Sequence, residues 1–326
     1  MEIRSNTSLR FSAGTQWECI LASAGLTPDR DTDQTVTIWE QDTMIATGSR
    51  KGNLLKCIAV HPDRRGEDLT ATVLSQLRSD AFAAGHKHLF LYTKPENRRM
   101  FESLFFYPIA QTDTVLLMED QHNGIHSFLA TLPQPAAGKK IGAAVMNCNP
   151  FTLGHRYLIE TAATECDHVY IFVLSEEQSR FSAHERMEMV RLGTADLSNV
   201  TVLPTGPYLI SSATFPTYFL KDRESAPQAH CKLDIQIFEN YFVPRFGITH
   251  RYVGTEPLSP ITAQYNNALK ENLHKVTLVE IPRLETGNRP VSASAVRTAL
   301  DQNEDIRALV PESTYRYLTQ GGIIHG

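Results

Sequence analysis

The chain has 326 residues, of which 42% are hydrophobic, and this is enough for two domains that each contain a core. Its formal net charge of −5 argues against a nucleic-acid-binding surface as the main function. Every apolar run is shorter than a membrane-spanning helix, and the N-terminal sequence MEIRSNTSLR lacks the hydrophobic core of a signal peptide. We therefore expect a cytoplasmic protein.

The cysteines do not form a metal-binding or disulfide pattern. They are scattered along the chain without C-x-x-C spacing, so the sequence predicts neither a zinc site nor a disulfide framework. Nor does the sequence contain a clear cluster of other metal ligands. Cys148 lies inside a turn discussed below, and we expect it to be a small buried residue without a chemical role.

In the N-terminal region, residues 58–69 predict a strand that runs through a loop into a helix. This segment, IAVHPDRRGEDL, resembles the pyrophosphate loop of GCN5-type acetyltransferases, and residues 89–92 with Asn97 resemble their later motif. The family pattern R-G-x-G-x-G/A has a second glycine where this chain has Asp68 and a small residue where it has Thr70. A carboxylate would repel a diphosphate, and a side chain narrows the backbone approach. The resemblance implies an acetyltransferase-like domain over residues 1–121 without acetyl-CoA activity, retained for docking a partner or a phosphopantetheine-like arm.

Residues 122–138 are predicted to be a linker. They end in LPQPAAG, which is rich in proline and lacks periodicity. The second domain then occupies residues 139–326.

The second domain begins with a strand, a tight turn and a helix. Residues 141–146 form a short apolar run, and Asn147, Asn149 and Pro150 follow it. A helix that opens just after Gly154 is predicted from apolar residues that share one face at a 3.6-residue period: Leu158, Ile159, Ala162, Ala163 and Cys166. Gly154 is placed where backbone approaches a ligand closely, and His155 lies in the first turn. Free N–H groups, the positive end of the helix dipole and an imidazole donor can together hold a polyphosphate.

Strands and helices alternate through the rest of the domain. Strands are predicted at residues 168–174, 200–203, 250–254 and 276–281, with helices at 182–193 and 233–246. This alternation favours an α/β fold with a doubly wound parallel sheet, whose ligands bind at the carboxyl ends of the strands. The turns at Asn149 and Gly254 both fall there. Neither a P-loop nor a G-x-G-x-x-G turn is present, so kinase-type and dinucleotide-oxidoreductase interpretations lose support.

Two motifs give the fold a more specific interpretation. The segment 152–155, TLGH, resembles the T/HxGH motif of the Rossmann-like nucleotidyltransferases and class I aminoacyl-tRNA synthetases, and the segment 291–297, VSASAVR, resembles their I-S-S-T-x-x-R signature. The resemblance implies ATP as substrate, with Mg²⁺ carried by the triphosphate and water rather than by a carboxylate cage. It implies catalytic roles for His155 and Arg297. The predicted ATP contacts are Asn149, Phe151, Thr152, Gly154, His155, Arg180, Gly254, Glu256, Ser292, Ser294 and Arg297.

Several of these residues also have a purely structural interpretation. Ser292 or Ser294 can cap a helix, and both interpretations can hold together, because a capped helix start is itself an oxyanion site. Ser182 and Glu185 form a capping box. Arg180 either reaches the triphosphate or is solvated, and Arg186 is predicted to be an intrahelical salt-bridge partner.

Three further segments resemble one particular family. Residues 210–219, ISSATFPTYF, together with VGTEP at 253–257 and TAQYN at 262–266, resemble the citrate lyase ligases over nearly the whole chain. The resemblance implies that acetate and ATP form acetyl-adenylate and pyrophosphate. The thiol of the prosthetic group on the acyl-carrier subunit of citrate lyase then takes the acetyl group and releases AMP. Ser211, Ser212 and Thr214 are the candidates for contacting the carboxylate or the carrier arm.

Two other functions remain open from the sequence. An adenylyltransferase that acts on a phosphate monoester, such as phosphopantetheine or nicotinamide mononucleotide, would use the same ATP motifs. A non-catalytic nucleotide sensor would bind ATP without releasing pyrophosphate. The acceptor separates the first alternative from a carboxylate-activating ligase, because one uses a phosphate ester and the other a free carboxylate.

Overall fold

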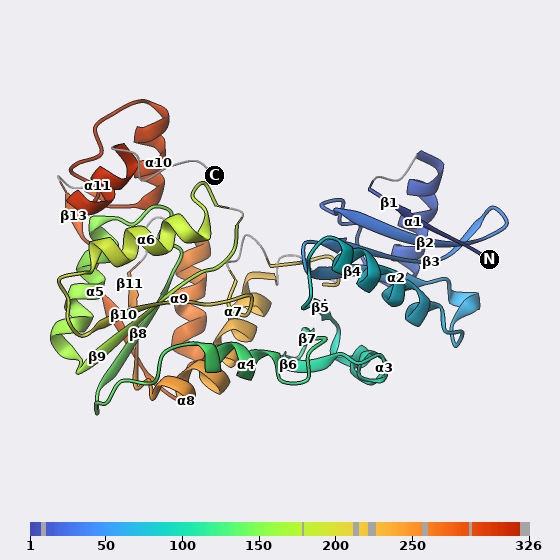
Figure 1. The fold of residues 1–326 in the computed structure, drawn as a ribbon, viewed down its shortest axis with the longest axis horizontal. Coiled ribbons are helices and arrows are strands. Elements are labelled where there is room, and N and C mark those ends of the chain that lie inside the picture. The colour runs from blue at the N-terminus through green and yellow to red at the C-terminus, as the bar shows by residue number, and fades with distance from the viewer. Residues whose placement is uncertain are drawn as a thin grey trace. The chain divides into compact units, whose positions relative to one another are not determined.

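The computed structural model describes residues 1–7, 11–177, 179–210, 215–220, 226–255, 260–286 and 289–319 (Figure 1). Contacts divide the chain into two units. The first contains Met1–Gly124 and Pro216–Ala229, and the second contains Ile125–Phe215 and His230–Gly326. A segment from the C-terminal half of the sequence therefore belongs to the N-terminal unit. Sequence periodicity gives no sign of this excursion.

The first unit contains a seven-stranded, mostly antiparallel sheet in the order β1-β2-β3-β4-β5-β7-β6. The strands are β1 (Glu2–Asn6), β2 (Gln34–Glu40), β3 (Thr43–Lys51), β4 (Leu54–Val60), β5 (Phe90–Thr93), β6 (Tyr107–Gln111) and β7 (Leu116–Glu119). β4 and β5 are parallel and pair only through Leu54 with Phe90 and Leu55 with Leu91. Beyond Leu55 the two strands carry no further pairing.

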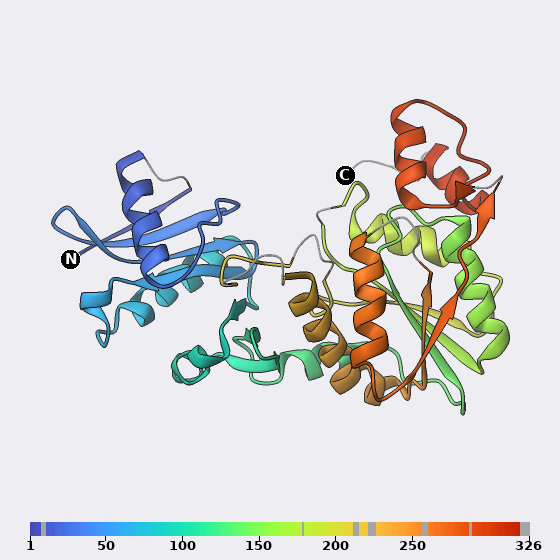
Figure 2. The ribbon, with the colours of Figure 1, turned by 180° about the vertical axis from the view of Figure 1, so that it is seen from behind.

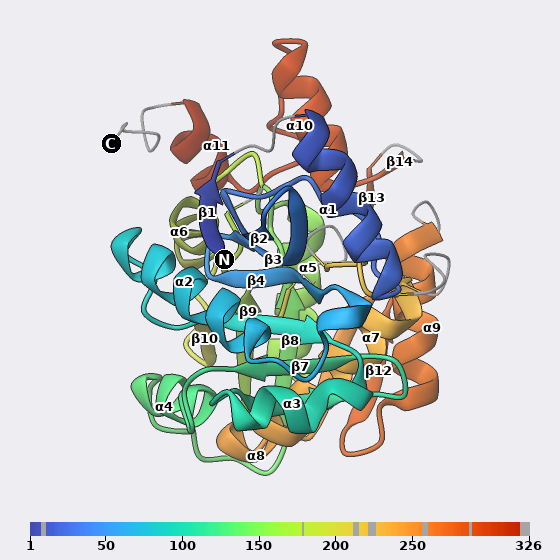
Figure 3. The same ribbon diagram turned by 90° about the vertical axis from the view of Figure 1, so that its right-hand side faces the viewer.

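Helices cover both faces of this sheet. They are α1 (Phe11–Ser23), α2 (Leu69–Ala83) and the short α3 (Arg98–Ser103), with single 3-10 turns at Pro62–Arg64 and Pro95–Asn97. Figure 3 shows α1 and α2 on opposite faces. α2 packs tightly, because a Cβ placed on Gly48 of β3 would lie 2.5 Å from the Val73 side chain. The predicted strand–loop–helix at residues 58–69 is present as the end of β4, the loop and the start of α2.

The second unit contains a parallel five-stranded sheet in the order β10-β9-β8-β11-β12. The strands are β8 (Ile141–Met146), β9 (His168–Val173), β10 (Val200–Pro204), β11 (His250–Gly254) and β12 (Thr277–Ile281). The predicted parallel sheet is confirmed. The strand order reverses between β8 and β11, and parallel sheets bind ligands at such a switch point, beyond the carboxyl ends of the strands.

Helices cover both faces of the second sheet as well. The helices between residues 124 and 319 are α4 (Gly124–Thr131), α5 (Leu153–Glu165), α6 (Ala183–Gly193), α7 (Ala226–Ile237), α8 (Val243–Phe246), α9 (Pro260–Asn272), α10 (Ala293–Asp301) and α11 (Glu312–Thr319). A π-helical turn (Phe238–Phe242) precedes α8, and a small hairpin consists of β13 (Glu285–Thr286) and β14 (Arg289–Pro290). In the described part of the chain, each helix is too short or too polar to span a membrane.

The alternating side chains of β9 define the two layers. Ile171 and Val173 pack in the core beneath α5 and α6, whereas Phe172, on the opposite face, contacts Phe242 and Phe246. Figure 2 shows α9, in orange, on the same face as α7. α5 and α9 therefore approach the β8–β11 switch point from opposite faces.

Three elements differ from the sequence-based expectation. α5 begins at Leu153 rather than after Gly154, because the Thr152 side chain caps it. The predicted helix at residues 233–246 starts earlier, at Ala226, and is interrupted by the π-helical turn. Helix α4 lies within residues 122–138, which we predicted to be a linker.

Candidate nucleotide-binding site

A pocket of about 360 Å³ lies at the carboxyl ends of β8 and β11. We call it the β8–β11 pocket. It brings together five residues that the sequence assigned to ATP binding: Thr152, Gly154, His155, Gly254 and Ser292. The sequence motifs at residues 152–155 and 291–297 are thus adjacent at the switch point of the sheet.

His155 is held by a capping box at the start of α5. The Thr152 hydroxyl accepts the His155 N–H at 3.3 Å, and His155 Nδ1 accepts the Thr152 N–H at 3.1 Å. Since Nδ1 is the acceptor, the neutral ring carries its proton on Nε2. Burial, and to a lesser extent the charge of Arg283, lower the pKa of His155 to about 4. At neutral pH, His155 is therefore an uncharged hydrogen-bond donor in the pocket wall.

Phe151 contacts the imidazole ring of His155. Its ring is fully buried and stacks on the His155 ring with centroids 5.9 Å apart. Phe151 does not line the β8–β11 pocket. Its assignment as a direct ATP contact stays a prediction, and its observed contact is with the His155 ring.

Gly154 allows the two motifs to approach each other. A Cβ at this position would lie 3.2 Å from the carbonyl oxygen of Val291, which is closer than a side chain normally comes. Ser292 caps α10 by accepting the Ala295 N–H at 3.1 Å. The starts of α5 and α10 therefore both contribute to the pocket, through Thr152 and Ser292.

Arg297 and Asn149 hold the loop that follows β8. Arg297 donates to the Asn149 carbonyl at 2.6 Å and to the Ser294 hydroxyl at 3.2 Å. Asn149 Oδ1 in turn accepts the Phe181 N–H at 3.3 Å. Arg297, Asn149 and Ser294 do not line the pocket, so their contacts with ATP stay predictions.

Arg180 also lies outside the pocket wall. Its guanidinium donates to the Asp301 carboxylate at 2.5 Å and to the Arg297 carbonyl at 3.2 Å. Arg180 therefore ties the segment before α6 to α10. A contact with the triphosphate would require it to leave Asp301.

The prediction for Arg186 is wrong. Rather than pairing along its own helix, Arg186 is fully buried and donates to the Asn147 carbonyl at 3.0 Å and to the Phe181 carbonyl at 3.1 Å, with a further bond to the Glu176 carbonyl. A guanidinium can serve several carbonyls at once because it carries five N–H donors in a fixed plane. Arg186 therefore holds the loop after β8 through its hydrogen bond to the Asn147 carbonyl.

The end of β11 is positioned by hydrogen bonds to two other segments. The Asn266 side chain on α9 donates to the Gly254 carbonyl at 2.9 Å, and the Thr255 hydroxyl accepts a hydrogen bond from the backbone N–H of Arg283 at 3.0 Å. Glu256, Ser211, Ser212 and Thr214, which the sequence assigned to ATP or to the carboxylate, lie outside the described residues.

The pocket-wall residues that received no role from the sequence include Arg251, Tyr265, Asn266 and Arg283. Tyr265 and Asn266 belong to the TAQYN string, which carried the family resemblance and could have pointed to them. Arg251 is a single arginine within β11 and Arg283 a single arginine just after β12, and no local pattern marks them.

Cys148 is buried, and burial raises the pKa of its thiol. It is therefore a poor nucleophile, as the sequence led us to expect. Among the described residues, no group of three or more His, Cys, Asp or Glu side chains is placed to hold a metal ion.

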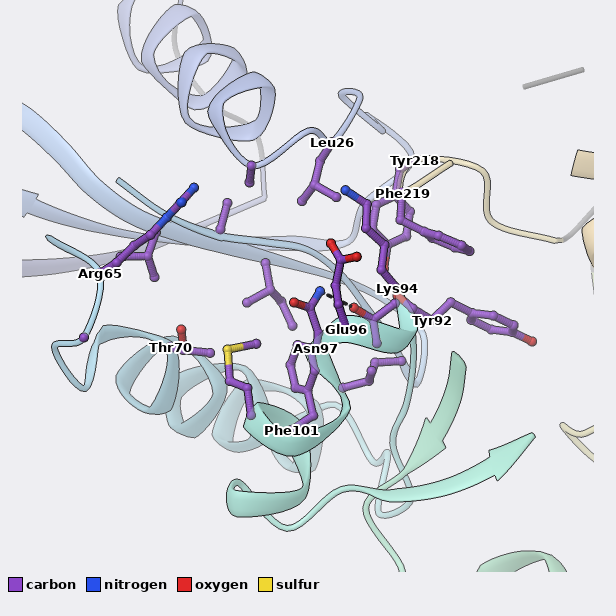
Figure 4. Close-up of a pocket in the computed structure, with 18 of the residues that line it drawn as sticks. Leu26, Arg65, Thr70, Tyr92, Lys94, Glu96, Asn97, Phe101, Tyr218 and Phe219 are labelled. Atoms are coloured by element: carbon purple, nitrogen blue, oxygen red, sulfur yellow. Dashed lines mark hydrogen bonds between the residues drawn. The ribbon is translucent and has the colours of Figure 1, made fainter. Parts of the chain in front are cut away.

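The first unit contains a pocket of about 530 Å³ where β4 and β5 diverge. We call it the β4–β5 pocket. Figure 4 shows Thr70, Arg65, Glu96 and Asn97 around it. Asp68 is exposed and does not line it, so the carboxylate that the loop contributes is Glu67.

The inserted segment closes one side of the β4–β5 pocket. Tyr218 and Phe219 line it, and the buried Tyr218 hydroxyl donates to the Tyr92 carbonyl at 2.6 Å. The Tyr218 carbonyl accepts the Thr27 N–H at 2.8 Å. Four residues from the family-like string at 210–219, residues 216–219, therefore lie in the first unit.

Comparison with known proteins agrees with these motifs. Residues 141–318 match the family model of the citrate lyase ligase C-terminal domain. The chain is 41% identical over 307 residues to the citrate (pro-3S)-lyase ligase of Klebsiella pneumoniae, and the match covers 90% of this chain and 89% of the relative.

Two solved structures each resemble a part of the chain. Thermotoga maritima TmcAL bound with alpha-thio ATP is 15% identical, with a TM-score of 0.37 and 56% of each chain covered. An acyl-CoA N-acyltransferase from Pseudomonas aeruginosa is 9% identical, with a TM-score of 0.32, and covers 37% of this chain and 100% of its own. With the family model matching more than half of its residues and the K. pneumoniae enzyme matching nearly all of it, the chain belongs to the citrate lyase ligase family.

Proposed function

We propose that this protein is an ATP-dependent acid–thiol ligase that activates acetate and transfers the acetyl group to the acyl-carrier subunit of citrate lyase. Family membership supports the partner, because the curated relative carries the name of a citrate lyase ligase. The β8–β11 pocket supports the use of ATP. The single observation that carries the proposal is the neutral His155 donor, fixed at the start of α5 beside the capped start of α10.

The first step forms acetyl-adenylate. A carboxylate oxygen of acetate bonds to the α-phosphorus of ATP, while the bond from that phosphorus to the bridging oxygen breaks and pyrophosphate leaves. His155 Nε2–H and the free amides at the starts of α5 and α10 donate to phosphate oxygens and stabilise the charge that develops there. Because His155 is neutral, it donates a hydrogen bond without giving up its proton.

The second step transfers the acetyl group. The thiolate sulfur of the carrier's prosthetic group bonds to the acetyl carbon, and AMP leaves with the electrons of the broken C–O bond. The thiol proton passes to water. No nucleophile from this chain is required, and the buried Cys148 supplies none. The chain's part is to position the reactants and to stabilise charge.

We further propose that Mg²⁺ enters with ATP, since this hard cation prefers phosphate oxygens and water. Because the chain belongs to the citrate lyase ligase family, we also propose that the protein works in the cytoplasm, where citrate lyase and ATP are both available.

The test is acetate-dependent exchange of labelled pyrophosphate into ATP, with and without the acyl-carrier subunit. We expect exchange that requires acetate and does not require the carrier. Exchange that appears only with a phosphate monoester would instead support an adenylyltransferase. ATP binding without exchange under either condition would support a nucleotide sensor.

A further inference from the structure

Arg251 is a buried arginine in the wall of the β8–β11 pocket. It lies on β11, and only 2% of its surface is exposed. Its guanidinium carbon lies 4.1 Å from the centre of the Phe238 ring. A buried guanidinium in a ligand pocket is costly unless its N–H groups are bonded, so its partners indicate what it is there to bind.

Within the described residues, those partners are few. Nη2 lies 3.5 Å from the Tyr265 hydroxyl, which is long for a hydrogen bond. Nε is fully buried and has no hydrogen-bond partner. By contrast, the buried Arg186 donates to three backbone carbonyls. Arg251 therefore retains donor capacity that Arg186 has already used.

A nearby carboxylate balances the charge of Arg251 without filling its donors. Asp234 on α7 is buried and accepts a hydrogen bond from the Tyr265 hydroxyl. Burial, and secondarily the charge of Asp234, raise the pKa of Tyr265 well above its ordinary range, so its proton stays on the phenol. Asp234 thus compensates Arg251 through Tyr265, while the guanidinium remains able to take an anion.

The position of Arg251 separates it from the donors at the start of α5. Tyr252, the next residue on β11, bonds to Glu165 at the end of α5, so it faces that helix. Adjacent residues of a strand point to opposite faces, and Arg251 contacts Tyr265 on α9. Arg251 and His155 therefore line one pocket from opposite sides of the sheet.

This separation fits the geometry of the proposed reaction. In an in-line displacement at the α-phosphorus, the attacking oxygen and the leaving pyrophosphate lie on opposite sides of the phosphorus. The triphosphate and the attacking carboxylate therefore need separate anion sites. The donors at the starts of α5 and α10 provide one, and Arg251 provides a second on the α9 side.

We propose that Arg251, oriented by Tyr265 and Asp234, binds the carboxylate of a small monocarboxylate substrate. The Arg251 guanidinium holds one carboxylate oxygen and leaves the other to attack the α-phosphorus. Val145 offers an apolar surface for the methyl group, because it lines the pocket two residues after Ala143, the partner of Arg251 in β8. This inference rests on the proposed function, since it assigns the acetate site of that reaction.

The test compares Arg251→Met, Arg251→Lys and Tyr265→Phe with the wild type in acetate-dependent pyrophosphate exchange. A charge-assisted hydrogen bond predicts that Arg251→Met raises the KM for acetate about 10- to 100-fold, with the KM for ATP changed less than about twofold. Arg251→Lys keeps the charge and should restore part of the affinity. Tyr265→Phe should have a smaller effect of the same kind.

Arg245→Met is the matched control. Arg245 also stacks on a phenylalanine, Phe246, but it donates to the backbone carbonyls of Leu129, Leu132 and Pro133 and does not line the pocket. We expect it to lower stability without a selective change in the KM for acetate. An unchanged KM for acetate in Arg251→Met, or an equal rise in the KM for ATP, would overturn the proposal. If Arg251→Met does not fold, Arg251→Lys and Tyr265→Phe decide by the same criteria.

A direct binding measurement separates this inference from the proposed function. Binding of ¹³C-labelled acetate is followed by NMR in the presence of α,β-methylene ATP, for the wild type and Arg251→Met. Acetate binding that requires Arg251, in a wild type that performs no exchange, would sustain the subsite and refute the ligase function. Wild-type exchange with acetate binding unaffected in Arg251→Met would do the reverse.

Discussion

The two pockets of this protein differ in their charges. In the β8–β11 pocket, the charged side chains of the wall are those of Arg251 and Arg283, beside the neutral His155 and two capped helix starts. In the β4–β5 pocket, the basic residues Arg65 and Lys94 are accompanied by the carboxylates Glu67 and Glu96. Arg65 and Lys94 also contact backbone carbonyls. The second pocket is therefore less suited to an anion, although its loop resembles a pyrophosphate loop.

The comparison shows that a resemblance in one loop does not determine the charge of the cavity beside it. The charged residues of the β4–β5 pocket come from two segments, the loop at 65–67 and residues 94–96. The predictions below test whether only the β8–β11 pocket performs chemistry.

The largest effect is expected from removing the imidazole of the β8–β11 pocket. His155→Ala should lower the rate of acetate-dependent pyrophosphate exchange about 10²- to 10³-fold, the cost of losing one donor to a developing oxyanion. The far-ultraviolet circular dichroism spectrum should be unchanged. The exposed His184 provides the control, and His184→Ala should exchange at the wild-type rate. A near-native rate in His155→Ala would contradict the proposed role of His155 in stabilising charge on the phosphates.

The next effect concerns the loop that carries the pocket. Arg186→Met should lower the free energy of unfolding by about 3 kcal/mol, because three backbone carbonyls lose their donor. Urea unfolding measures this directly. Arg191→Met, an exposed change on the same helix, should stay within about 0.5 kcal/mol. Equal losses in both variants would show that Arg186 does not hold the loop.

The low pKa of His155 in the β8–β11 pocket should make the stability of the protein depend on pH. The pKa of His155 is about 4 in the folded protein against an ordinary value of 6.5. Between these values the unfolded chain binds a proton that folded His155 does not, so the contribution of His155 to stability falls as pH decreases from about 6.5 to 4 and is constant above that window. His155→Gln should lack this contribution. Unfolding measured at several pH values for both proteins would show it as a pH-dependent difference, and parallel curves would contradict the assigned pKa.

A smaller effect is expected in the first unit. Tyr218→Phe removes the hydrogen bond to the Tyr92 carbonyl and should lower the free energy of unfolding by about 1 kcal/mol. Pyrophosphate exchange should not change. Tyr107→Phe, at a half-buried tyrosine of the same unit, is the control for stability. A clear loss of exchange in Tyr218→Phe alone would mean that the β4–β5 pocket takes part in the first step.

The smallest effect is expected at the loop of the β4–β5 pocket. Asp68→Gly restores the glycine of the acetyltransferase pattern, yet it should change neither exchange nor transfer to the carrier, since Asp68 is exposed and outside the pocket wall. Asp113→Gly is the matched exposed control. A large change in acetyl transfer with Asp68→Gly would show that this loop contributes to the reaction.

Much of the second unit could be predicted because its signals are local. The apolar run at 141–146 and the strand at 250–254 were predicted with the bounds that β8 and β11 have. The capping box at Ser182 was equally visible, since it involves residues three apart. Thr152 and His155 form a second capping box with the same spacing, but its acid is replaced by histidine, so the usual pattern did not reveal it.

Other features required contacts between distant residues. Arg186 was assigned to a salt bridge along its own helix, whereas its acceptors include Asn147, 39 residues earlier. The membership of Pro216–Ala229 in the first unit has no local signal either. Periodicity reports which face of an element is buried, but it does not report which other element covers that face.

The sequence by itself determined the parallel α/β fold of the second unit, the two nucleotide motifs and the family, because strands, helix caps and motifs depend on residues that are close in the chain. Only the tertiary structure decided how these parts are used. It placed Gly154 against Val291, fixed the proton of His155 on Nε2, and brought Arg251 into the pocket wall with an unfilled donor. The physical reason is that burial and hydrogen-bond partners, which set charge state and donor capacity, come from the whole fold.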